Sequence, residues 1–362
     1  MKLLVITQKV NKNDSNLGFF HLWLQKLAAQ VDHLYVVCLE KGGYNLPSNV
    51  TVISLGKENK RTSSLIYSFQ FYRALWKLRG KYENVFVHMN PEYAILAGWL
   101  WRVTGKKVLL WYVHKAVNWR LRLGALFATK IFTASKESFR MPSKKVEVVG
   151  HGIPVEIFAK QQLKRSSGVL EAPIGTLFLM SAGRISPAKD LETVFRALEA
   201  LRKNTALPGW NYKFFGRPIT QQDEYYKNKI ENLASQLLEP IFKIEDQTNL
   251  YDQMPMIYQE HYILIHTSQT GSMDKVVLEA LASGRIVVTS SEVFASLADG
   301  ELKGVVFKFP QGNSQELANT IEKIYKNGIL NTIPNQRGID YVMQHHNLDN
   351  LVRKIIGYFK SV

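Results

Sequence analysis

Short apolar runs rich in β-branched residues alternate with longer amphipathic segments along the chain, and this alternation constrains the fold more than any other feature. In the first half, the apolar runs fall at residues 2–7, 33–39, 49–55, 84–89, 106–113, 130–135 and 146–153. Helix-like segments lie between several of them, at 18–30, 63–78 and 91–103. Strands that are apolar throughout and separated by helices are typical of a parallel sheet covered on both faces.

The pattern is interrupted once and then restarts. Residues 160–175 (KQQLKRSSGVLEAPIG) are polar and have the composition of an interdomain linker. After them we predict strands at 176–183, 210–216, 241–245, 262–268 and 285–290, and helices at 188–203, 221–237, 251–259 and 274–283. A chain of 362 residues exceeds the size of most single cores. The sequence therefore predicts an α/β protein with two doubly wound, Rossmann-like parallel-sheet domains.

The excess of positive over negative charge is confined to the first half of the chain. Residues 1–165 contain 26 Lys and Arg against 9 Asp and Glu, whereas the remaining residues contain 20 against 21. The whole net charge of +16 therefore comes from the first half. Such an imbalance favours an anionic partner or surface for that half only.

Two further features bear on the compartment. The single cysteine, Cys38, lies in an apolar run and has no disulfide partner, which is typical of a reducing environment. The longest apolar stretch, residues 93–101, is about half of the roughly 20 residues that a membrane-spanning helix needs. We therefore expect a cytoplasmic protein that is soluble or peripheral on a membrane.

The loop that follows the strand at 176–183 reads GRISPAKD and carries two cations, Arg184 and Lys189. In open α/β sheets, ligands bind at the carboxyl ends of the strands. An arginine and a lysine beside a helix N-terminus suit a diphosphate, because arginine binds phosphate oxygens bidentately and lysine supplies a point charge. The alternative is a solvated loop whose cations pair with Asp190 and Glu192.

A second such loop lies within HTSQTGSMDKVVLEALASGRIVVTS, residues 266–290. Ser272 and Asp274 can cap the helix that follows, whose first N–H groups attract anions, and Lys275 adds a positive charge there. Glu279 is the one carboxylate on an otherwise apolar helix. It can accept hydrogen bonds from vicinal hydroxyls such as those of a ribose. The alternative is an ordinary ion pair with Lys275.

Together these segments resemble the family-4 (group 1) glycosyltransferases of GT-B architecture. GRISPAKD resembles the family's Gly-Arg…Lys turn, LEALASGRIVV (278–288) its Leu-Glu-Ala helix and strand, and VVGHGIPVEIF (148–158) the segment that closes the first domain. The resemblance implies an acceptor-binding domain at 1–165 and a donor-binding domain at 166–339. It also implies a terminal segment, 340–362, that packs back on the first domain.

The resemblance also implies roles for individual residues. Arg184 and Lys189 would bind the donor diphosphate and stabilise the charge on the departing nucleotide. Glu279 matches the second glutamate of the family's Glu-x7-Glu motif and would hold the ribose. His114 would reach the transferred sugar, unless it only packs or contacts the acceptor. The remaining donor contacts would come from Gly18, Gly183, Ser272, Met273, Asp274 and Lys275.

One position departs from the family pattern. Gly271 stands where the first glutamate of the motif is expected, so the identity of the donor sugar does not follow by analogy. Three alternatives are open: Asp274 replaces the missing carboxylate, the donor is an unusual sugar, or the activity is lost. The family mechanism implied is hexosyl transfer with retention, from a UDP- or GDP-sugar co-substrate, without a metal or other cofactor. The sequence contains no HExxH, EF-hand, cysteine cluster, P-loop or GxGxxG motif.

The acceptor is inferred from residues 99–130. This segment interleaves tryptophans with cations, namely Trp99, Trp101, Trp111 and Trp119 with Arg102, Lys106, Lys107, Arg120 and Arg122. Such a composition is typical of a surface that binds anionic lipid. We therefore expect peripheral binding to the inner face of the cell membrane and a lipid-linked, phosphate-bearing or glycan acceptor in cell-surface glycan synthesis. The alternative is that the tryptophans are core and the cations solvated.

Two other functions remain open from the sequence. The same fold can act on nucleotide sugars with a soluble acceptor, or as an epimerase. A basic, aromatic-rich half can also bind nucleic acid, although the chain contains no helix-turn-helix, RNA-recognition or zinc motif. Nucleic-acid binding would leave the phosphate-site loops of the second half without a role, so we do not expect a nucleic-acid partner.

Overall fold

The computed structural model describes residues 1–14, 16–59, 63–159, 176–203, 207, 209–238, 242–245 and 250–361. It divides into two compact units, of which the first is Met1–Gly152 with Leu348–Val362 and the second is Ile153–Asn347. The predicted boundary at 165/166 lies outside the described residues. The terminal segment that joins the first unit begins at Leu348, whereas residues 340–347 belong to the second unit.

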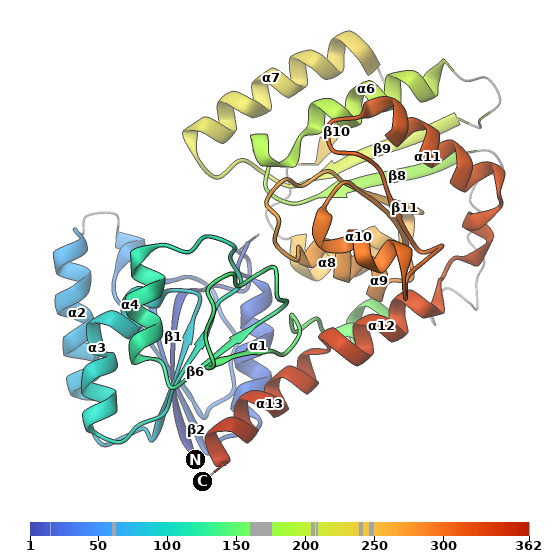
Figure 1. Cartoon of the computed structure of the whole chain (residues 1–362). Helices are drawn as coiled ribbons and strands as arrows, with labels where there is room; N and C mark the ends of the chain where they lie inside the picture. Colours follow the sequence, from blue (N-terminus) through green and yellow to red (C-terminus); the bar gives the residue numbers. More distant parts are fainter. Residues whose placement is uncertain are drawn as a thin grey trace. The chain divides into compact units, whose positions relative to one another are not determined.

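The first unit is built on a seven-stranded sheet in the order β3-β2-β1-β4-β5-β6-β7, in which all neighbours pair parallel (Figure 1). The central strand β1 pairs with β2 on one side and β4 on the other, which is the strand order of a doubly wound fold. The strands are β1 Lys2–Val10, β2 His33–Lys41, β3 Val50–Ser54, β4 Asn84–His88, β5 Val108–Trp111, β6 Lys130–Thr133 and β7 Val146–Val148.

Helices cover both faces of this sheet. Alternate strand residues separate the two cores: Leu3 and Val5 pack with α1 and α13, whereas Leu4 and Ile6 pack with α2, α3 and α4. Residues 337–359, helical in pattern, form two helices because Asn347 has extended backbone. The helices of this unit are α1 Phe19–Ala28, η1 Lys57–Asn59, α2 Ser64–Lys77, α3 Pro91–Val103, α4 Trp119–Phe127 and α13 Leu348–Lys360.

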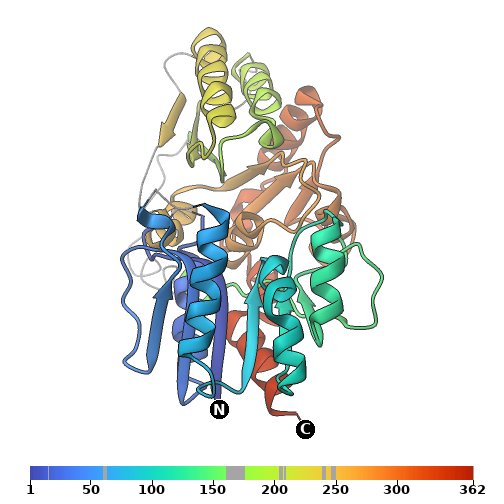
Figure 2. The same cartoon turned by 90° about the vertical axis from the view of Figure 1, so that its left-hand side faces the viewer.

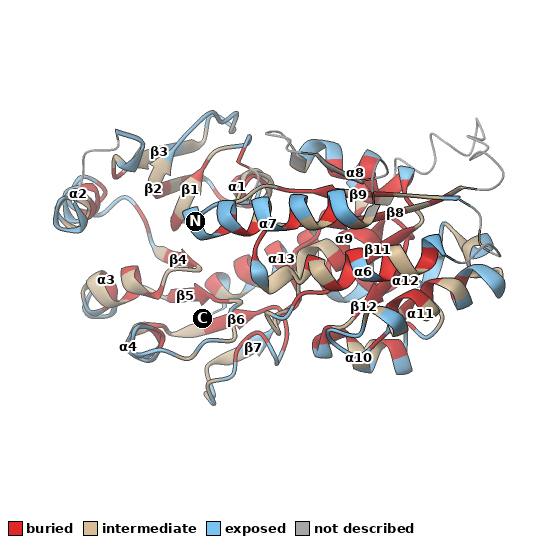
Figure 3. Cartoon of the chain, turned by 90° about the horizontal axis from the view of Figure 1, so that it is seen from above, coloured by how far each residue is buried: buried red, intermediate tan, exposed pale blue. Residues whose placement is uncertain are grey.

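The second unit contains a six-stranded parallel sheet in the order β10-β9-β8-β11-β12-β13. Its strands are β8 Thr176–Ala182, β9 Gly209–Phe215, β10 Phe242–Glu245, β11 Ile263–His266, β12 Ile286–Thr289 and β13 Val306–Lys308. Its helices are η2 Pro187–Lys189, α6 Leu191–Arg202, α7 Gln221–Leu238, α8 Leu250–Glu260, α9 Lys275–Ala282, α10 Glu292–Asp299, α11 Ser314–Lys326, η3 Ile329–Thr332 and α12 Gln336–His346. Figure 3 shows that the inner strands of both sheets are mostly buried, whereas helices such as α7 and α11 have exposed residues along one side.

The predicted fold class, two doubly wound parallel-sheet domains, is confirmed. The sequence analysis did not predict α4, α10, α11 or β13. A local signal for α4 exists, because the Asn118 side chain accepts a hydrogen bond from the Leu121 amide at 2.9 Å and so caps the helix. Within the described part of the chain, no helix is long and apolar enough to cross a membrane.

Stability of the second unit is expected to fall at mildly acidic pH because of His261. Burial lowers the pKa of this imidazole to about 4, although its Nδ1 lies 2.7 Å from the Ile257 carbonyl oxygen. Between the unfolded value near 6.5 and about 4, only the unfolded chain binds the proton. The free energy of unfolding therefore decreases as pH falls through this window, by at most about 3 kcal/mol.

Urea unfolding of wild type and His261→Phe at pH 4, 5, 6 and 7 measures this contribution. The variant is expected to lose less stability than wild type between pH 7 and 4, and His345→Gln, at an exposed histidine, is expected to behave like wild type. Parallel pH profiles for wild type and His261→Phe would contradict the assignment.

Candidate functional site

The loops after β8 and β11 lie together at the carboxyl edge of the second sheet, because the two strands are parallel neighbours. The Gln269 amide donates to the Ala188 carbonyl at 2.9 Å, which fixes one loop to the other. Gly183 follows β8 with φ +130°, a conformation that favours glycine. A Cβ at this position would lie 3.3 Å from Cε of Lys189. Glycine therefore keeps room for the lysine side chain.

Arg184 pairs with a buried carboxylate, Asp223. Its Nε and Nη2 lie 2.7 and 2.6 Å from Oδ2 of Asp223, and the amides of Ile219 and Thr220 donate to the same oxygen at 3.0 and 2.9 Å. Burial alone would raise the pKa of Asp223, but these hydrogen bonds lower it to about 2. The Arg184 side chain itself is 44% exposed, so the pair holds a guanidinium that still faces solvent.

Lys189 pairs with Asp274 from the second loop. Its Nζ lies 2.7 Å from Oδ2 of Asp274 and 3.3 Å from Oγ of Ser268. His266, the last residue of β11, places its Nε2 2.9 Å from the same carboxylate oxygen. Burial would raise the pKa of Asp274, but the charge of Lys189 and the hydrogen bond from His266 hold it well below the usual range.

The expected capping role of Asp274 is not seen. Asp274 is the N-cap residue of α9, yet its side chain makes no capping hydrogen bond. The ammonium of Lys189 and the imidazole of His266 bind the carboxylate instead.

Glu279 lies buried on α9 with 4% of its surface exposed. The Tyr258 hydroxyl donates to its Oε2 at 3.2 Å, and Nζ of Lys275 lies 3.9 Å from Oε1. Burial raises the pKa of Glu279, and it lowers the pKa of Lys275 to about 7. Lys275 also lies 5.2 Å from the ring centre of Tyr251. The structure therefore contains the ion pair between Glu279 and Lys275, which the sequence analysis gave as the alternative to ribose binding.

The remaining predicted residues fall into two places. Met273 is buried and Ser272 half-buried in the loop before α9. Gly18 and His114 belong to the first unit, after the carboxyl ends of β1 and β5. A Cβ on Gly18 would lie 2.5 Å from the Asp14 carbonyl oxygen, so the loop itself requires glycine there. His114 is exposed, and its Nδ1 accepts a hydrogen bond from the Ala116 amide at 3.0 Å.

Sequence reasoning missed Asp223, His266 and Tyr258. It offered Asp190 and Glu192 as partners of the two loop cations, and the structure shows that this is wrong. Asp190 caps α6 by accepting from the Thr193 amide at 3.4 Å, and Glu192 accepts from Lys229 at 2.9 Å. Asp223 follows β9, the parallel neighbour of β8, so strand order was the signal that could have found it.

The first unit carries a second candidate surface, on the side of its sheet that α2, α3 and α4 cover. The three helices lie side by side there, coloured blue, teal and green (Figures 1 and 2). We call this the α2–α4 surface. Its exposed apolar residues are Leu65, Ile66, Phe69, Tyr72, Trp76, Trp99, Val103, Trp119, Leu123 and Leu126. Its exposed cations are Arg73, Lys77, Arg102, Arg120 and Arg122.

The predicted surface at 99–130 is only partly correct. Trp101 and Trp111 are buried core residues, whereas Trp99 and Trp119 are exposed. Lys106 donates to the Tyr82 carbonyl at 2.7 Å and Lys107 to the Tyr358 carbonyl at 3.3 Å, so both are tied to backbone. The structure adds α2, which the sequence analysis did not include.

Among the described residues, no group of three or more His, Cys, Asp and Glu side chains could hold a metal ion. The expectation that the protein needs no metal stays a prediction.

A search of solved structures finds this fold in glycosyltransferases. HepE of Anabaena in complex with UDP has a TM-score of 0.74 and 16% identity, with 100% of each chain covered. Sucrose-phosphate synthase of Thermosynechococcus elongatus has a TM-score of 0.77 and 14% identity, covering 99% of this chain and 98% of that one. A trehalose-6-phosphate synthase studied for glycosyltransfer with retention has a TM-score of 0.73 and 14% identity, covering 100% and 99%. A search of curated proteins finds no match.

These similarities establish the class, a GT-B fold of the kind that glycosyltransferases share. Residues 164–340 match the model of the family described as glycosyl transferases group 1. The matched stretch contains Arg184, Lys189 and Glu279. The resemblance inferred from the sequence is therefore confirmed.

Replacing Asp223 by Asn is expected to lower the free energy of unfolding at pH 7 by about 1–2 kcal/mol, because Arg184 loses its charged partner. The carboxylate's contribution is present above its unfolded pKa near 3.8 and is lost as pH falls toward about 2. Urea unfolding at pH 7 and pH 2.5 measures both effects.

Glu224→Gln is the matched control, since this neighbouring carboxylate is exposed. A stability loss in Asp223→Asn that is the same at both pH values would show that the ion pair is not its cause.

Proposed function

We propose that this protein transfers a hexosyl group from a nucleotide sugar to an acceptor, with retention at the anomeric carbon. The observation that carries the proposal is the pair of cations, Arg184 and Lys189, held by one buried and one partly exposed carboxylate at one sheet edge inside the family-matched stretch. HepE has been crystallised with UDP-glucose, which supports a nucleotide-sugar donor for this chain. The trehalose-6-phosphate synthase studied for retention supports a retaining mechanism.

Arg184 and Lys189 are proposed to bind the diphosphate. A guanidinium has five N–H donors; Asp223 engages Nε and one N–H of Nη2, and the Thr220 hydroxyl lies 3.3 Å from Nη2. The two N–H donors of Nη1, whose position this pairing fixes, suit phosphate oxygens. Lys189 has three donors, of which Asp274 and Ser268 engage two. Both cations thus face the developing charge of the leaving nucleotide without a large reorganisation, and no metal ion is then needed.

Glu279 is proposed to hold the ribose. An ionised carboxylate has about four acceptor positions, and Tyr258 and Lys275 leave part of this capacity for vicinal hydroxyls. Gly271, in place of the usual glutamate, leaves the sugar end with one carboxylate fewer. Asp274 is already engaged by Lys189 and His266, so it compensates only by sharing its oxygens. His114 and Gly18 stay proposed contacts to the transferred sugar and the donor.

The acceptor is proposed to be lipid-linked, on the inner face of the cell membrane. The support is the α2–α4 surface, where Leu65, Phe69 and Trp76 are 80%, 67% and 68% exposed on one stripe of α2. Residues at these spacings lie on one helix face. Exposed aromatic and aliphatic side chains beside several arginines suit an anionic membrane interface. The proposed role is a step of cell-surface glycan synthesis.

A thermal-shift screen of UDP, GDP, ADP and their sugars tests the donor site. One nucleotide is expected to raise the melting temperature of wild type, by several degrees at a hundredfold excess over Kd, because only the folded protein binds it. The shift is expected to vanish in Arg184→Ala and to shrink strongly in Glu279→Gln.

Arg196→Ala and Glu224→Gln are controls at exposed positions of the same unit. Both are expected to keep the full shift. If no nucleotide at millimolar concentration shifts the folded wild type, the proposed site is wrong.

Flotation with liposomes tests the membrane contact. The protein is expected to float with vesicles containing anionic phospholipid and not with phosphatidylcholine alone, and 0.5 M salt is expected to weaken the binding by screening. Phe69→Ser/Trp76→Ser is expected to lose most of the binding, whereas Tyr225→Ser, at a 77% exposed site of the second unit, retains it. Equal recovery with both vesicle types would remove the membrane proposal and favour a soluble acceptor.

A further inference from the structure

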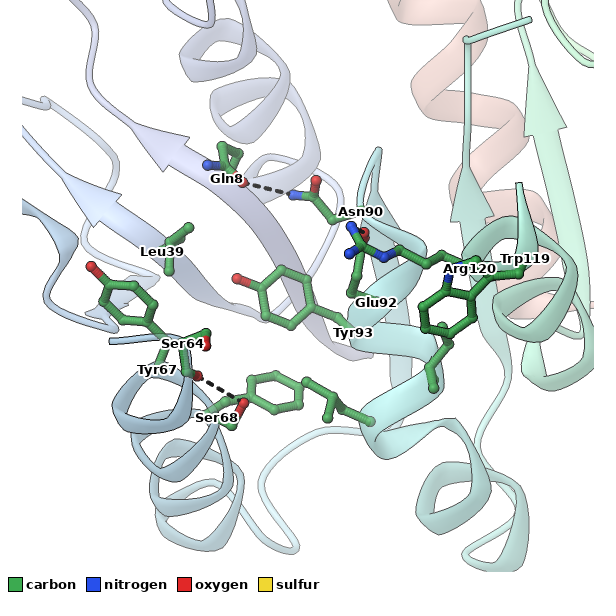
Figure 4. A pocket seen from close by; sticks show the side chains of 13 residues that line it. Gln8, Leu39, Ser64, Tyr67, Ser68, Asn90, Glu92, Tyr93, Trp119 and Arg120 are labelled. Carbon is green, nitrogen blue, oxygen red and sulfur yellow. Dashed lines mark hydrogen bonds and ion pairs between the residues drawn. The ribbon is translucent and has the colours of Figure 1, made fainter. Parts of the chain in front are cut away.

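A cavity of about 460 Å³ lies within the first unit, whereas Arg184 and Lys189 belong to the second unit. Its walls come from α2, α3 and the first turn of α4, including Tyr67, Phe71, Tyr93, Leu96 and Trp119 (Figure 4). This volume falls within the range of small-ligand pockets. The walls are mainly aromatic and aliphatic, so the cavity suits an apolar group.

One end of the cavity is polar. The Asn90 side-chain amide donates to Oε1 of Gln8 at 3.2 Å, and Figure 4 shows this pair on the side away from Ser68. Gln8 lies near the carboxyl end of β1 and Asn90 just beyond β4, so this end faces the sheet edge at which doubly wound folds bind ligands. Arg120 and Glu92 add an ion pair of 3.2 Å at the rim. The cavity thus has polar groups toward the sheet edge and apolar walls between the helices.

The apolar walls adjoin the α2–α4 surface. Tyr67 and Phe71 of the cavity lie on the same helix as the exposed Phe69 and Trp76. The Tyr72 hydroxyl donates to the Leu96 carbonyl at 2.8 Å, which joins α2 to α3 beside the cavity. Trp119 lines the cavity and is also 62% exposed. A chain that leaves a membrane against this surface would therefore meet the cavity directly.

We propose that this cavity binds the apolar chain of the acceptor lipid, with the polar head toward Gln8 and Asn90. That the bound lipid is the sugar acceptor rests on the proposed function. Independently of that function, the cavity is a binding site for an anionic amphiphile with an isoprenoid or acyl chain. Arg120 at the rim selects the anionic head, and the aromatic walls select the chain.

Photolabelling with a benzophenone derivative of geranyl monophosphate tests this site on the full chain. Labels are expected on α2 and α3 residues that line the cavity, and geranylgeranyl monophosphate or oleoyl lysophosphatidic acid is expected to compete. The better competitor identifies the chain as isoprenoid or acyl. Inorganic phosphate and isopentenyl monophosphate, which lack a long chain, are expected not to compete.

Ser68→Trp fills the cavity from α2 and is expected to reduce labelling at least tenfold. Gln70→Trp adds the same side chain to α2 at a position that does not line the cavity, and it is expected to label like wild type. Leu96→Gln makes the α3 wall polar and is expected to act in the same direction as Ser68→Trp. Unchanged labelling in Ser68→Trp and Leu96→Gln, or competition by inorganic phosphate, would overturn the proposal.

The nucleotide-induced thermal shift separates this proposal from the proposed function. Ser68→Trp is expected to keep the full shift, which also shows that it folds. If a nucleotide shifts the melting temperature of wild type but the cavity is not labelled, the proposed lipid site is wrong and the proposed donor site is retained. If the cavity is labelled but no nucleotide shifts the melting temperature, the cavity still binds an anionic amphiphile, but its proposed role in sugar transfer is wrong.

Discussion

The parallel pairing of β8 with β11 is the constraint on which the candidate site depends. Because parallel neighbours end at the same sheet edge, the pairing brings GRISPAKD against the loop before α9, although Lys189 and Asp274 are 85 residues apart. Asp274 has little exposed surface, and a carboxylate in that position needs a cation. Lys189 supplies it, and the glycine at 183 leaves room for the lysine. Strand order thereby fixes the position of Lys189 in the candidate site.

Each cation of the site is held by a carboxylate, and in the Arg184 pair the carboxylate is much more deeply buried than the cation. Asp223 is 3% exposed while its partner Arg184 is 44% exposed, and the low pKa of Asp223 means that the carboxylate stays charged at any physiological pH. Such pairs stabilise little by themselves, because burial offsets most of the attraction. Their effect is to hold a guanidinium and an ammonium in fixed positions with donors still available. A fixed positive field is what a leaving diphosphate requires.

In the first unit, helix α2 is apolar on two sides. Helix α2 packs Phe71, Ala74 and Leu75 into the core, yet its opposite stripe is also apolar and exposed. A helix on the surface of a globular protein ordinarily carries polar residues on that stripe. Several exposed cations of the basic first half, among them Arg73, Arg102 and Arg122, lie on the same three helices. Apolar and basic side chains are therefore exposed together on α2, α3 and α4.

The alternation of apolar runs and helical segments determined the fold class, and the motifs in the two loops determined the family, because both signals are local in the chain. The sequence also placed Arg184, Lys189 and Glu279 at strand ends or on the adjoining helix. Only the tertiary structure decided their partners, since Asp223 lies 39 residues from Arg184 and becomes its neighbour through the β8–β9 pairing. It also decided which tryptophans face water: Trp99 and Trp101 lie two positions apart on α3 and therefore point to different sides. Composition counts both residues alike, whereas burial depends on which side of the helix the sheet covers.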